Sequence, residues 1–342
     1  MNPRDRVVAQ LEHCETDFIP YVVPVEPEVA ERLDRHYGSP RWRDVKCDHI
    51  VRVRVANLLS RQSIDDGRAR DCCGSIWRMD RLPYHLEQPA LPEPDLSGYE
   101  FPSPDGVFPE DWLQESVREC EEHHRAGKFV MAVVSYGLFE RSWIMRGFEN
   151  VLMDMALQPA FVEELLDGIT EFLLGAIERF VQLPLDGIQT GDDWGHQRGL
   201  IMGKERWVEL FLPRYRRLWG RIKEAGMFTI HHSCGNISEV VGEAADAGLD
   251  CLESVQPEAM DVYRLKEEFG DRMAFWGAVG TQQLLPRGTP ETIREEVQRL
   301  CRHMGRGGGY VLAPAKPVMT EVPTGNAAAF LEAVLGQAGQ SL

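Results

Sequence analysis

The chain has 342 residues, with 37 lysines and arginines against 54 aspartates and glutamates, which gives a formal net charge of −17. A chain of this length buries roughly 75% of the surface that its unfolded form exposes, so its core needs no disulfide or metal. The negative charge disfavours nucleic acid as a partner, because the molecule as a whole would repel phosphates.

The first residues, MNPRDRVVAQLEH, are charged and lack the apolar segment of a secretory signal. No later apolar run approaches the roughly 18 residues that span a bilayer. The eight cysteines are dispersed along the chain, as is typical of free thiols in a reducing compartment. We therefore expect a cytoplasmic protein with no membrane segment.

Eight short apolar runs rich in Val, Ile and Phe predict β-strands. In chain order they are 18–23, 49–55, 129–135, 186–192, 227–234, 250–255, 273–279 and 309–314. The second run, HIVRVRV, has the weakest pattern, because its alternating arginines fit an antiparallel excursion equally well. Residues 65–108 combine an expected hairpin with six prolines, which indicates a meander or extended arm outside the repeat.

Amphipathic helical patterns separate the later runs. They cover 161–180, 204–225 (where Pro213 opens a second helix or kinks one), 236–247, 262–268, 290–304 and 324–337. Regular alternation from residue 129 onward implies parallel strands joined by helical crossovers. Eight such strands predict an α/β protein with one closed (β/α)8 TIM barrel over residues 1–342.

In a barrel of this kind the reactive side chains come from the C-terminal ends of the strands. His232 and Cys234 are two residues apart at the end of the fifth run, so their side chains point to the same face. An imidazole and a thiolate on one face suit a zinc ion. The alternative is a hydrogen-bonded core histidine beside a buried thiol.

Carboxylates follow two neighbouring runs. Asp192 and Asp193 repel each other, so at least one needs a cation, a donor network or a shifted pKa, unless one of them caps a helix. Glu253 is a candidate third metal ligand, a general base or a partner for an arginine. Lys316, after the last run, is either a substrate-facing cation or an exposed loop residue. Four further residues are expected at the same mouth of the barrel: Tyr136, Trp194, His196 and Gln256.

The adjacent residues Cys72 and Cys73 lie in the expected hairpin. Neighbouring side chains of a strand point to opposite faces, which favours structural roles for both cysteines.

Six segments, matched in order, resemble the uroporphyrinogen decarboxylase superfamily. They are MNPRDRVVAQLEHCETDFIPY, CCGSIWRM, GDDWGHQRGLIMGKERWVELFLPRYRRLW, HHSCGNISEVVGEAADAGLDCLESVQP, LKEEFGDRMAFWGAVGTQQLLPRGTPETI and GGGYVLAPAKPVMTEVPTGN. The resemblance extends over nearly the whole chain and implies a single (β/α)8 barrel.

Two chemistries occur in that superfamily. True decarboxylases hold substrate carboxylates with an arginine-rich segment similar to RQAGRY, and residues 17–45 contain nothing like it. The other branch consists of corrinoid-dependent methyltransferases, and its coenzyme M members bind zinc through His-x-Cys and a later cysteine. His232 and Cys234 match the first two ligands, whereas LAPAKPVM has no cysteine. The resemblance therefore implies a third ligand from Glu253, one of the two aspartates or His196.

The resemblance thus implies a zinc-assisted methyltransferase. It would move a methyl group between a small donor, such as a methyl ether, and the cobalt of a separate corrinoid (cobalamin-carrying) protein, as in O-demethylase systems. His232, Cys234 and Glu253 are the expected metal ligands, and Asp192 and Asp193 would orient the substrate or transfer protons. Tyr136 and Trp194 would form pocket walls. The corrinoid protein would dock over the barrel mouth, because this chain has no obvious corrinoid-binding domain.

The alternative activity is a metal-independent decarboxylase of a small carboxylated or porphyrin-like substrate. Asp192 or Asp193 would then steer protonation, and Lys316 or Arg198 would hold a carboxylate. A non-catalytic binding barrel is a third possibility, against which the adjacent aspartates argue weakly.

Overall fold

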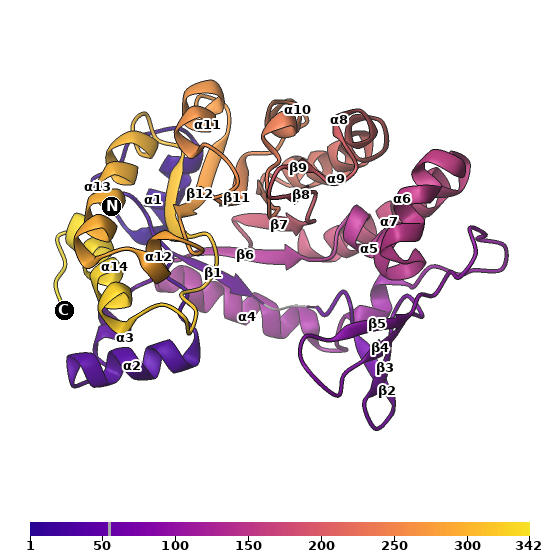
Figure 1. Ribbon diagram of the computed structural model, residues 1–342, viewed down its shortest axis with the longest axis horizontal. Helices are drawn as coiled ribbons and strands as arrows, with labels where there is room; N and C mark the ends of the chain where they lie inside the picture. The colour runs from indigo at the N-terminus through magenta and orange to yellow at the C-terminus, as the bar shows by residue number, and fades with distance from the viewer. Residues whose placement is uncertain (54–55) are drawn as a thin grey trace.

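The computed structural model describes residues 1–53 and 56–342, and a curved parallel sheet forms its centre (Figure 1). The strands, in order across the sheet, are β1 (Ile50–Val53), β6 (Phe129–Val134), β7 (Gly187–Gly191), β10 (Phe228–His232), β11 (Cys251–Val255), β12 (Ala274–Val279) and β13 (Tyr310–Pro314). All neighbours in this sheet pair in parallel. Seven of the eight predicted runs are therefore confirmed as parallel strands, including HIVRVRV, whose residues 54–55 lie outside the described part.

The first predicted run, residues 18–23, is not a regular strand. Tyr21 forms an isolated parallel bridge with Leu312 of β13. On one side the amide of Val22 donates to the carbonyl of Leu312 (3.0 Å), and on the other the amide of His49 donates to the carbonyl of Tyr21 (3.1 Å). This short segment therefore lies between the two edges of the sheet. Pro20 lies within it and Pro24 directly follows it, and both lack the N–H that a longer ladder would need.

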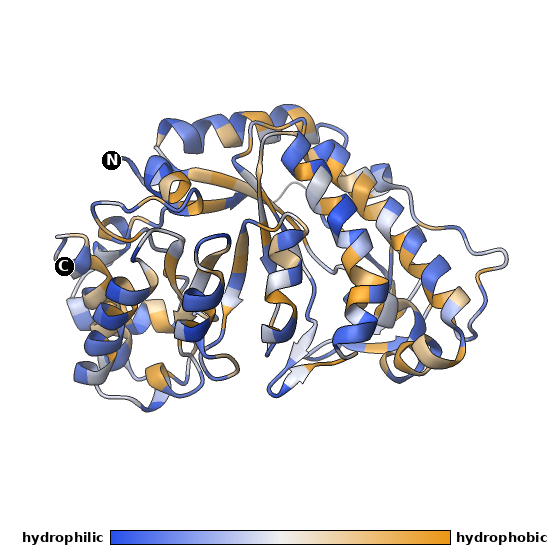
Figure 2. Ribbon diagram, turned by 90° about the horizontal axis from the view of Figure 1, so that it is seen from above, coloured by the Kyte–Doolittle hydropathy of each residue, from blue (hydrophilic) through white to orange (hydrophobic). Residues whose placement is uncertain are grey.

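Helices cover the outside of the sheet (Figure 1). They are α1 (Pro3–Leu11), α2 (Pro27–Tyr37), α3 (Trp42–Val45), α4 (Trp112–Arg125), α5 (Leu138–Arg146), α6 (Phe148–Leu157), α7 (Pro159–Phe180), α8 (Lys204–Arg206), α9 (Leu212–Glu224), α10 (Val241–Asp246), α11 (Val262–Phe269), α12 (Leu284–Arg287), α13 (Pro290–Met304) and α14 (Thr324–Gln337). Short 3-10 turns occupy Pro104–Val107 and Ser238–Val240, and a π-helical turn occupies Trp207–Phe211. Figure 2 shows hydrophilic and hydrophobic residues alternating along these helices, the pattern of amphipathic helices.

The helix boundaries follow from local sequence. Pro213 stands in the first turn of α9, which follows α8 and the π-helical turn without a break, so the irregularity predicted within 204–225 takes the form of a π-helical turn before the proline. Helix α13 begins with a reciprocal capping box between Thr289 and Thr292. Helix α7 buries one apolar face that includes Leu165, Ile169 and Leu173, and this face packs against α5, α6 and α9.

A separate antiparallel sheet lies in the region predicted as an excursion. Its strands are β2 (Arg61–Asp65), β3 (Arg68–Asp71), β4 (Ile76–Arg78) and β5 (His85–Gln88). The antiparallel strands thus begin before residue 65, the predicted start of the excursion, and end at residue 88. The proline-rich remainder of the excursion contains one short 3-10 turn. A two-stranded hairpin, β8 (Gly195–His196) with β9 (Gly199–Leu200), follows β7.

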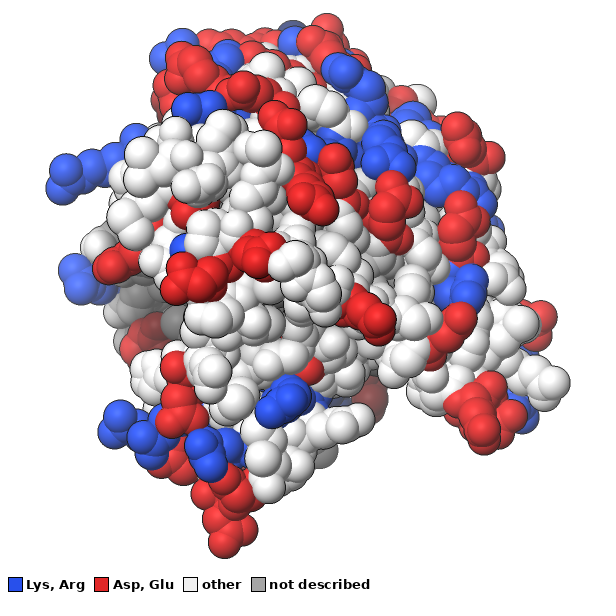
Figure 3. Space-filling model, turned by 90° about the vertical axis from the view of Figure 1, so that its right-hand side faces the viewer, with Lys and Arg blue, Asp and Glu red and all other residues white. Residues whose placement is uncertain are grey.

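The face that carries α6 and β2–β5 is mixed in character. Figure 3 shows acidic and basic side chains around a broad uncharged area on this side of the molecule. Phe148, Met153 and Leu157 of α6 are among the exposed large apolar side chains. No helix of the described residues is long and apolar enough to cross a membrane.

Candidate active site

A cavity of about 590 Å³ opens at the C-terminal ends of the parallel strands. This volume is in the range of small-molecule sites. Charged side chains from six separate segments line it: Arg52, Glu140, Asp193, His232, Glu253 and Lys316. Val22, Val133 and Trp276 contribute apolar walls. The parallel sheet therefore brings the ends of distant segments to one concavity, as expected for a barrel.

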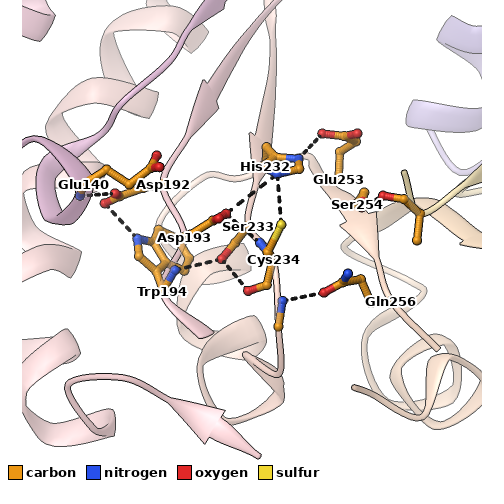
Figure 4. Close-up of polar contacts among 12 residues, drawn as sticks. Glu140, Asp192, Asp193, Trp194, His232, Ser233, Cys234, Glu253, Ser254 and Gln256 are labelled. Carbon is orange, nitrogen blue, oxygen red and sulfur yellow. Dashed lines mark hydrogen bonds and ion pairs between the residues drawn. The ribbon is translucent and has the colours of Figure 1, made fainter. Parts of the chain in front are cut away.

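His232 and Cys234 face each other at the end of β10 (Figure 4). The Cys234 Sγ lies 3.5 Å from Nε2 of His232. Asp193, from the loop after the neighbouring strand β7, places Oδ1 3.7 Å from the same nitrogen. One donor atom from each of the three residues lies within 4.8 Å of the other two. Among the described residues, this is the one group of three or more such side chains that could hold a metal ion.

The third donor of this cluster is Asp193, one of the alternatives predicted for that place, whereas Glu253 lies outside the cluster. Register explains the difference, because His232 pairs with Gly191 of β7 on one side and with Glu253 of β11 on the other. Glu253 Oε2 consequently lies 2.6 Å from Nδ1 of His232, at the ring nitrogen that faces away from Cys234. A carboxylate in that position orients a metal-binding imidazole without touching the metal.

The backbone of the loop after β10 fixes Asp193 as well. Its Oδ1 accepts a hydrogen bond from the amide of Cys234 (2.9 Å). Gly235 follows with φ +80, and a Cβ there would lie 2.4 Å from the carbonyl carbon of Gly195. Only glycine fits that close approach, so the turn holds Cys234 in place.

A polar network extends from Glu253 across the floor of the cavity. Gln189 Nε2 donates to Glu253 Oε2 (2.5 Å), and Arg52 Nε donates to Gln189 Oε1 (3.0 Å). Arg52 Nη2 also lies 3.4 Å from Glu253 Oε1, and its guanidinium lies 4.8 Å from the centre of the Trp276 ring. Sequence reasoning missed Arg52 and Gln189, although alternation in HIVRVRV places Arg52 on one face of its strand.

The network sets the charges around the imidazole. Burial would raise the pKa of Glu253, but His232, Arg52 and Gln189 outweigh it, so that pKa is lowered. Burial likewise opposes the charged form of His232, yet Glu253 and Cys234 hold the pKa of His232 well above its usual value. Both shifts favour the charged forms of His232 and Glu253, and a metal ion that takes Nε2 of a protonated His232 must displace its proton.

Asp192, predicted as catalytic, is fully buried and does not line the cavity. Its carboxylate accepts hydrogen bonds from the amides of Phe139 (2.8 Å) and Glu140 (2.7 Å) at the start of α5. Trp194 Nε1 (3.0 Å) and the Tyr215 hydroxyl (2.7 Å) donate to it as well. Burial raises the pKa of Asp192 to about 6 against these lowering hydrogen bonds. Asp192 therefore caps a helix, as the alternative interpretation of one of the two aspartates proposed, and the helix that it caps, α5, is distant in sequence.

Trp194 is also buried and is not a pocket wall. Its ring stacks on His231 with centroids 4.1 Å apart, and it meets Trp207 edge to face. Its amide donates to Ser233 Oγ (3.1 Å). Trp194 therefore ties the loop after β7 to residues 231–233, next to His232 and Cys234.

Two other predicted pocket residues lie outside the cavity lining. Gln256 is buried, and its Oε1 accepts from the amide of Gly235 (2.6 Å), so it supports the loop that carries Cys234. His196 is exposed in the hairpin, where its Nδ1 accepts from the amide of Arg198 (3.3 Å). Arg198 is exposed and does not line the cavity either.

Tyr136 and Lys316 line the cavity, as does Glu140, which sequence reasoning missed. Tyr136 has φ +57, a conformation that non-glycine residues rarely adopt and that clusters at functional sites. Burial, together with the negative charges of Asp192 and Asp193, raises the pKa of Glu140 to about 8. No sequence signal marked Glu140, because its position depends on the contact between the first turn of α5 and Asp192, which are distant in sequence.

Comparisons with known proteins agree with this architecture. A profile of the family described as "Uroporphyrinogen decarboxylase (URO-D)" matches residues 87–336. A uroporphyrinogen decarboxylase of Methylococcus capsulatus is 26% identical over 192 residues, 55% of this chain and 52% of that protein. A methylated-thiol–coenzyme M methyltransferase of Methanosarcina mazei is 27% identical over 301 residues, 86% of this chain and 79% of that protein. The chain thus spans about half the length of this decarboxylase relative.

A solved structure described as a methyltransferase from Methanosarcina mazei superposes with a TM-score of 0.71 and 17% sequence identity. The superposition covers 98% of both chains, so the two proteins share one fold along their whole length. The family prediction is confirmed: the chain belongs to the uroporphyrinogen decarboxylase (URO-D) family.

Proposed function

We propose that this protein is a metal-assisted methyltransferase that moves a methyl group between a small donor and a separate corrinoid protein. The observation that carries the proposal is the cluster of His232, Cys234 and Asp193 at one wall of the cavity. The likeness to a methylated-thiol–coenzyme M methyltransferase over most of the chain supports the choice of chemistry.

The donor set fits zinc. Four tetrahedral ligands at zinc bond lengths lie roughly 3.3 to 3.8 Å from one another. The Nε2 of His232 lies 3.5 Å from the Cys234 sulfur and 3.7 Å from the Asp193 oxygen. Mixed nitrogen, sulfur and oxygen ligation suits this ion. Three protein ligands would leave a fourth position for the substrate, which is the arrangement of catalytic zinc sites.

A zinc ion in this position would act as a Lewis acid on the oxygen or sulfur that carries the methyl group and would stabilise the leaving anion. Glu253 accepts the Nδ1 proton of His232 and so keeps Nε2 aimed at Cys234 and Asp193. Arg52 and Gln189 hold Glu253 in turn. The apolar walls exclude water from the reacting atoms.

Glu140 is our candidate proton donor. It lines the same cavity, and with its pKa raised to about 8 the carboxyl carries a proton at neutral pH. A protonated carboxyl facing the donor could transfer that proton to the leaving oxygen or sulfur. In the reverse direction the carboxylate would accept the proton of an incoming alcohol or thiol.

The decarboxylase alternative has less support from the site. Asp192 is buried under α5 and cannot touch a substrate, and Arg198 lies outside the cavity lining. Asp193 and Lys316 remain as candidate groups for that chemistry. A metal requirement separates the two activities.

The test combines metal analysis with a methyl-transfer assay. Protein purified from zinc-supplemented medium is expected to contain about one zinc per chain. Incubation with cob(I)alamin and a panel of methyl ethers and methyl thioethers is expected to produce methylcobalamin. Cys234→Ser should abolish both results, whereas Cys14→Ser, at an exposed position outside the cavity, should change neither. Substoichiometric metal, with activity unaffected by Cys234→Ser, would refute the proposed mechanism.

A further inference from the structure

Outside the cavity, a buried arginine lies beside the two neighbouring cysteines of the β3–β4 turn. Arg141 of α5 is 1% exposed, and its Nη1 donates to Cys73 Sγ (3.3 Å). Its Nη2 donates to the carbonyl of Leu58 (2.9 Å), and its guanidinium lies 4.8 Å from the centre of the Phe172 ring. Its Nε is buried and has no hydrogen-bond partner among the described residues.

A guanidinium cannot lose its proton inside a protein, so the positive charge of Arg141 needs a nearby negative charge. Among the described residues, no carboxylate forms an ion pair with Arg141. Asp71, in the same turn, directs its oxygens to the amides of Cys73 and Ser75 and to the Trp77 indole. The acidic group that remains in contact with the guanidinium is the Cys73 thiol. The Cys72 sulfur lies beside it, 3.5 Å from the Leu58 carbonyl that also accepts from Arg141.

The two thiols are close enough for one to donate a hydrogen bond to the other. Their sulfur atoms lie 4.0 Å apart, and Cys73 is buried whereas Cys72 is partly exposed. The hydrogen bond with Cys73 and the charge of Arg141 outweigh burial and lower the pKa of Cys72 to about 7. The same hydrogen bond and burial raise the pKa of Cys73. The first proton of the pair is therefore lost near neutral pH.

We propose that Cys72 and Cys73 form a modification site in which the pair carries a single negative charge, held by Arg141 through its contact with Cys73, and reacts with small soft electrophiles at the partly exposed Cys72. Hydroperoxides are the natural class of reagent. The sulfur attacks one peroxide oxygen, an S–O bond forms, the O–O bond breaks, and the departing hydroxide or alkoxide takes a proton from water. The sulfur is oxidised to a sulfenic acid while the peroxide is reduced, so electrons and atoms balance.

The site is joined to the active-site cavity through one helix. Glu140, which lines the cavity, immediately precedes Arg141 on α5. Conversion of the thiolate to a neutral sulfenic acid removes the charge that offsets Arg141. Modification is therefore expected to loosen the start of α5, where the amides of Phe139 and Glu140 bind Asp192.

Site-resolved alkylation of the full-length protein tests the proposal. Brief treatment with iodoacetamide at pH 7, followed by peptide mass spectrometry, gives a rate for each cysteine. Cys14 is exposed and serves as the internal reference, and the buried Cys120 serves as the unreactive control. Cys72 is expected to react at least about threefold faster than Cys14, although it is less exposed, because thiolates are the reacting species. Equal or slower alkylation of Cys72 would overturn the proposal.

A second arm uses hydrogen peroxide followed by dimedone, which traps sulfenic acids. The dimedone adduct is expected at Cys72 before it appears at Cys14. If Cys14 is trapped first, the peroxide chemistry assigned to Cys72 is wrong. Neither arm involves zinc or methyl transfer, so the result does not depend on the proposed function.

Variants at residue 141 test whether the fast alkylation of Cys72 is caused by the charge of Arg141 or by the exposure of the thiol. Arg141→Lys keeps the charge and should keep the alkylation rate of Cys72 within about threefold, whereas Arg141→Met should lower it to that of Cys14. A folded Arg141→Met protein with an unchanged rate would contradict the charge pairing. If Arg141→Met does not fold, Cys73→Ser provides the test, because loss of the Cys73 thiol should slow alkylation of Cys72 in a folded protein.

Discussion

Asp193 faces His232 across 3.7 Å, although Asp193 lies in the loop after β7 and His232 is the last residue of β10. The aspartate stands beside the imidazole nitrogen that Cys234 also approaches, and Glu253 occupies the opposite nitrogen. The donors of the site therefore come from two neighbouring strands, and the third strand contributes the residue that orients the histidine.

Substitutions in this cluster should separate ligands from orienting residues. Asp193→Asn and Cys234→Ser are expected to reduce zinc affinity far more than Glu253→Gln, which should cost about 10- to 100-fold because it loosens the imidazole without removing a ligand. Competition with a chromogenic chelator measures each affinity. Asp271→Asn, at an exposed position outside the cavity, is the control. If Glu253→Gln removed the metal and Asp193→Asn did not, our ligand assignment would be wrong.

The adjacent aspartates should lose very different amounts of stability on the same substitution. Asp192→Asn leaves donors at the start of α5 with fewer acceptors, so the free energy of unfolding should fall by about 2 to 4 kcal/mol. Asp193→Asn should cost less than about 1 kcal/mol, because its side chain is partly exposed. Urea denaturation of the metal-free proteins, monitored by tryptophan fluorescence, compares them. Similar losses in both variants would contradict the separate roles.

Glu140 should make the stability of the protein depend on pH. Its pKa is raised from 4.5 to about 8, so its favourable contribution is complete below 4.5 and is lost as pH rises through about 8. Glu140→Gln, which cannot ionise, should therefore gain stability relative to wild type with increasing pH. The gain is at most about 1.4 kcal/mol for each pH unit of the shift. Thermal melting at pH 5 and pH 9 measures it, and a pH-independent difference between the two proteins would argue against a buried acid at this position.

The methyl-transfer rate should depend on the same carboxyl. If Glu140 donates a proton to the leaving group, kcat should fall as pH rises through about 8. Glu140→Gln should lower kcat by about 100-fold and flatten this limb of the profile. Donors with acidic leaving groups, such as nitrophenyl methyl ethers, should be affected least. A variant that keeps the wild-type pH profile would exclude Glu140 as the proton donor.

The sequence predicted the location of the site better than the roles within it. The apolar runs placed His232, Cys234 and the aspartates at strand ends, and the alternation of side chains put His232 and Cys234 on one face. The role of Glu253 depends on its cross-strand partner, His232, and that register is set by the packing of whole strands. Asp192 contacts a helix that begins far away in the sequence, so neither its burial nor the nearby position of Glu140 had a local signal.

The predicted strand at residues 18–23, which is not regular, shows another limit of prediction from the sequence. The run at 18–23 is apolar enough for a strand, and its place between β1 and β13 is the place that a barrel strand would occupy. Two prolines restrict its ladder to a few bonds. A search for apolar runs responds to hydrophobic side chains only. It takes no account of the backbone N–H groups that a strand needs and that prolines lack.

The two sides of the cavity also differ in how firmly the backbone that carries them is held. Val22 and Pro24, which line the cavity, belong to the segment held by isolated bridges, whereas Asp193, His232 and Cys234 follow β7 and β10 in the middle of the continuous sheet. Segments with few backbone hydrogen bonds open first. Opening of the segment around Val22 and Pro24 would therefore widen the cavity while the donor atoms of Asp193, His232 and Cys234 keep their spacing, so the range of substrates and the geometry of these three side chains can change independently.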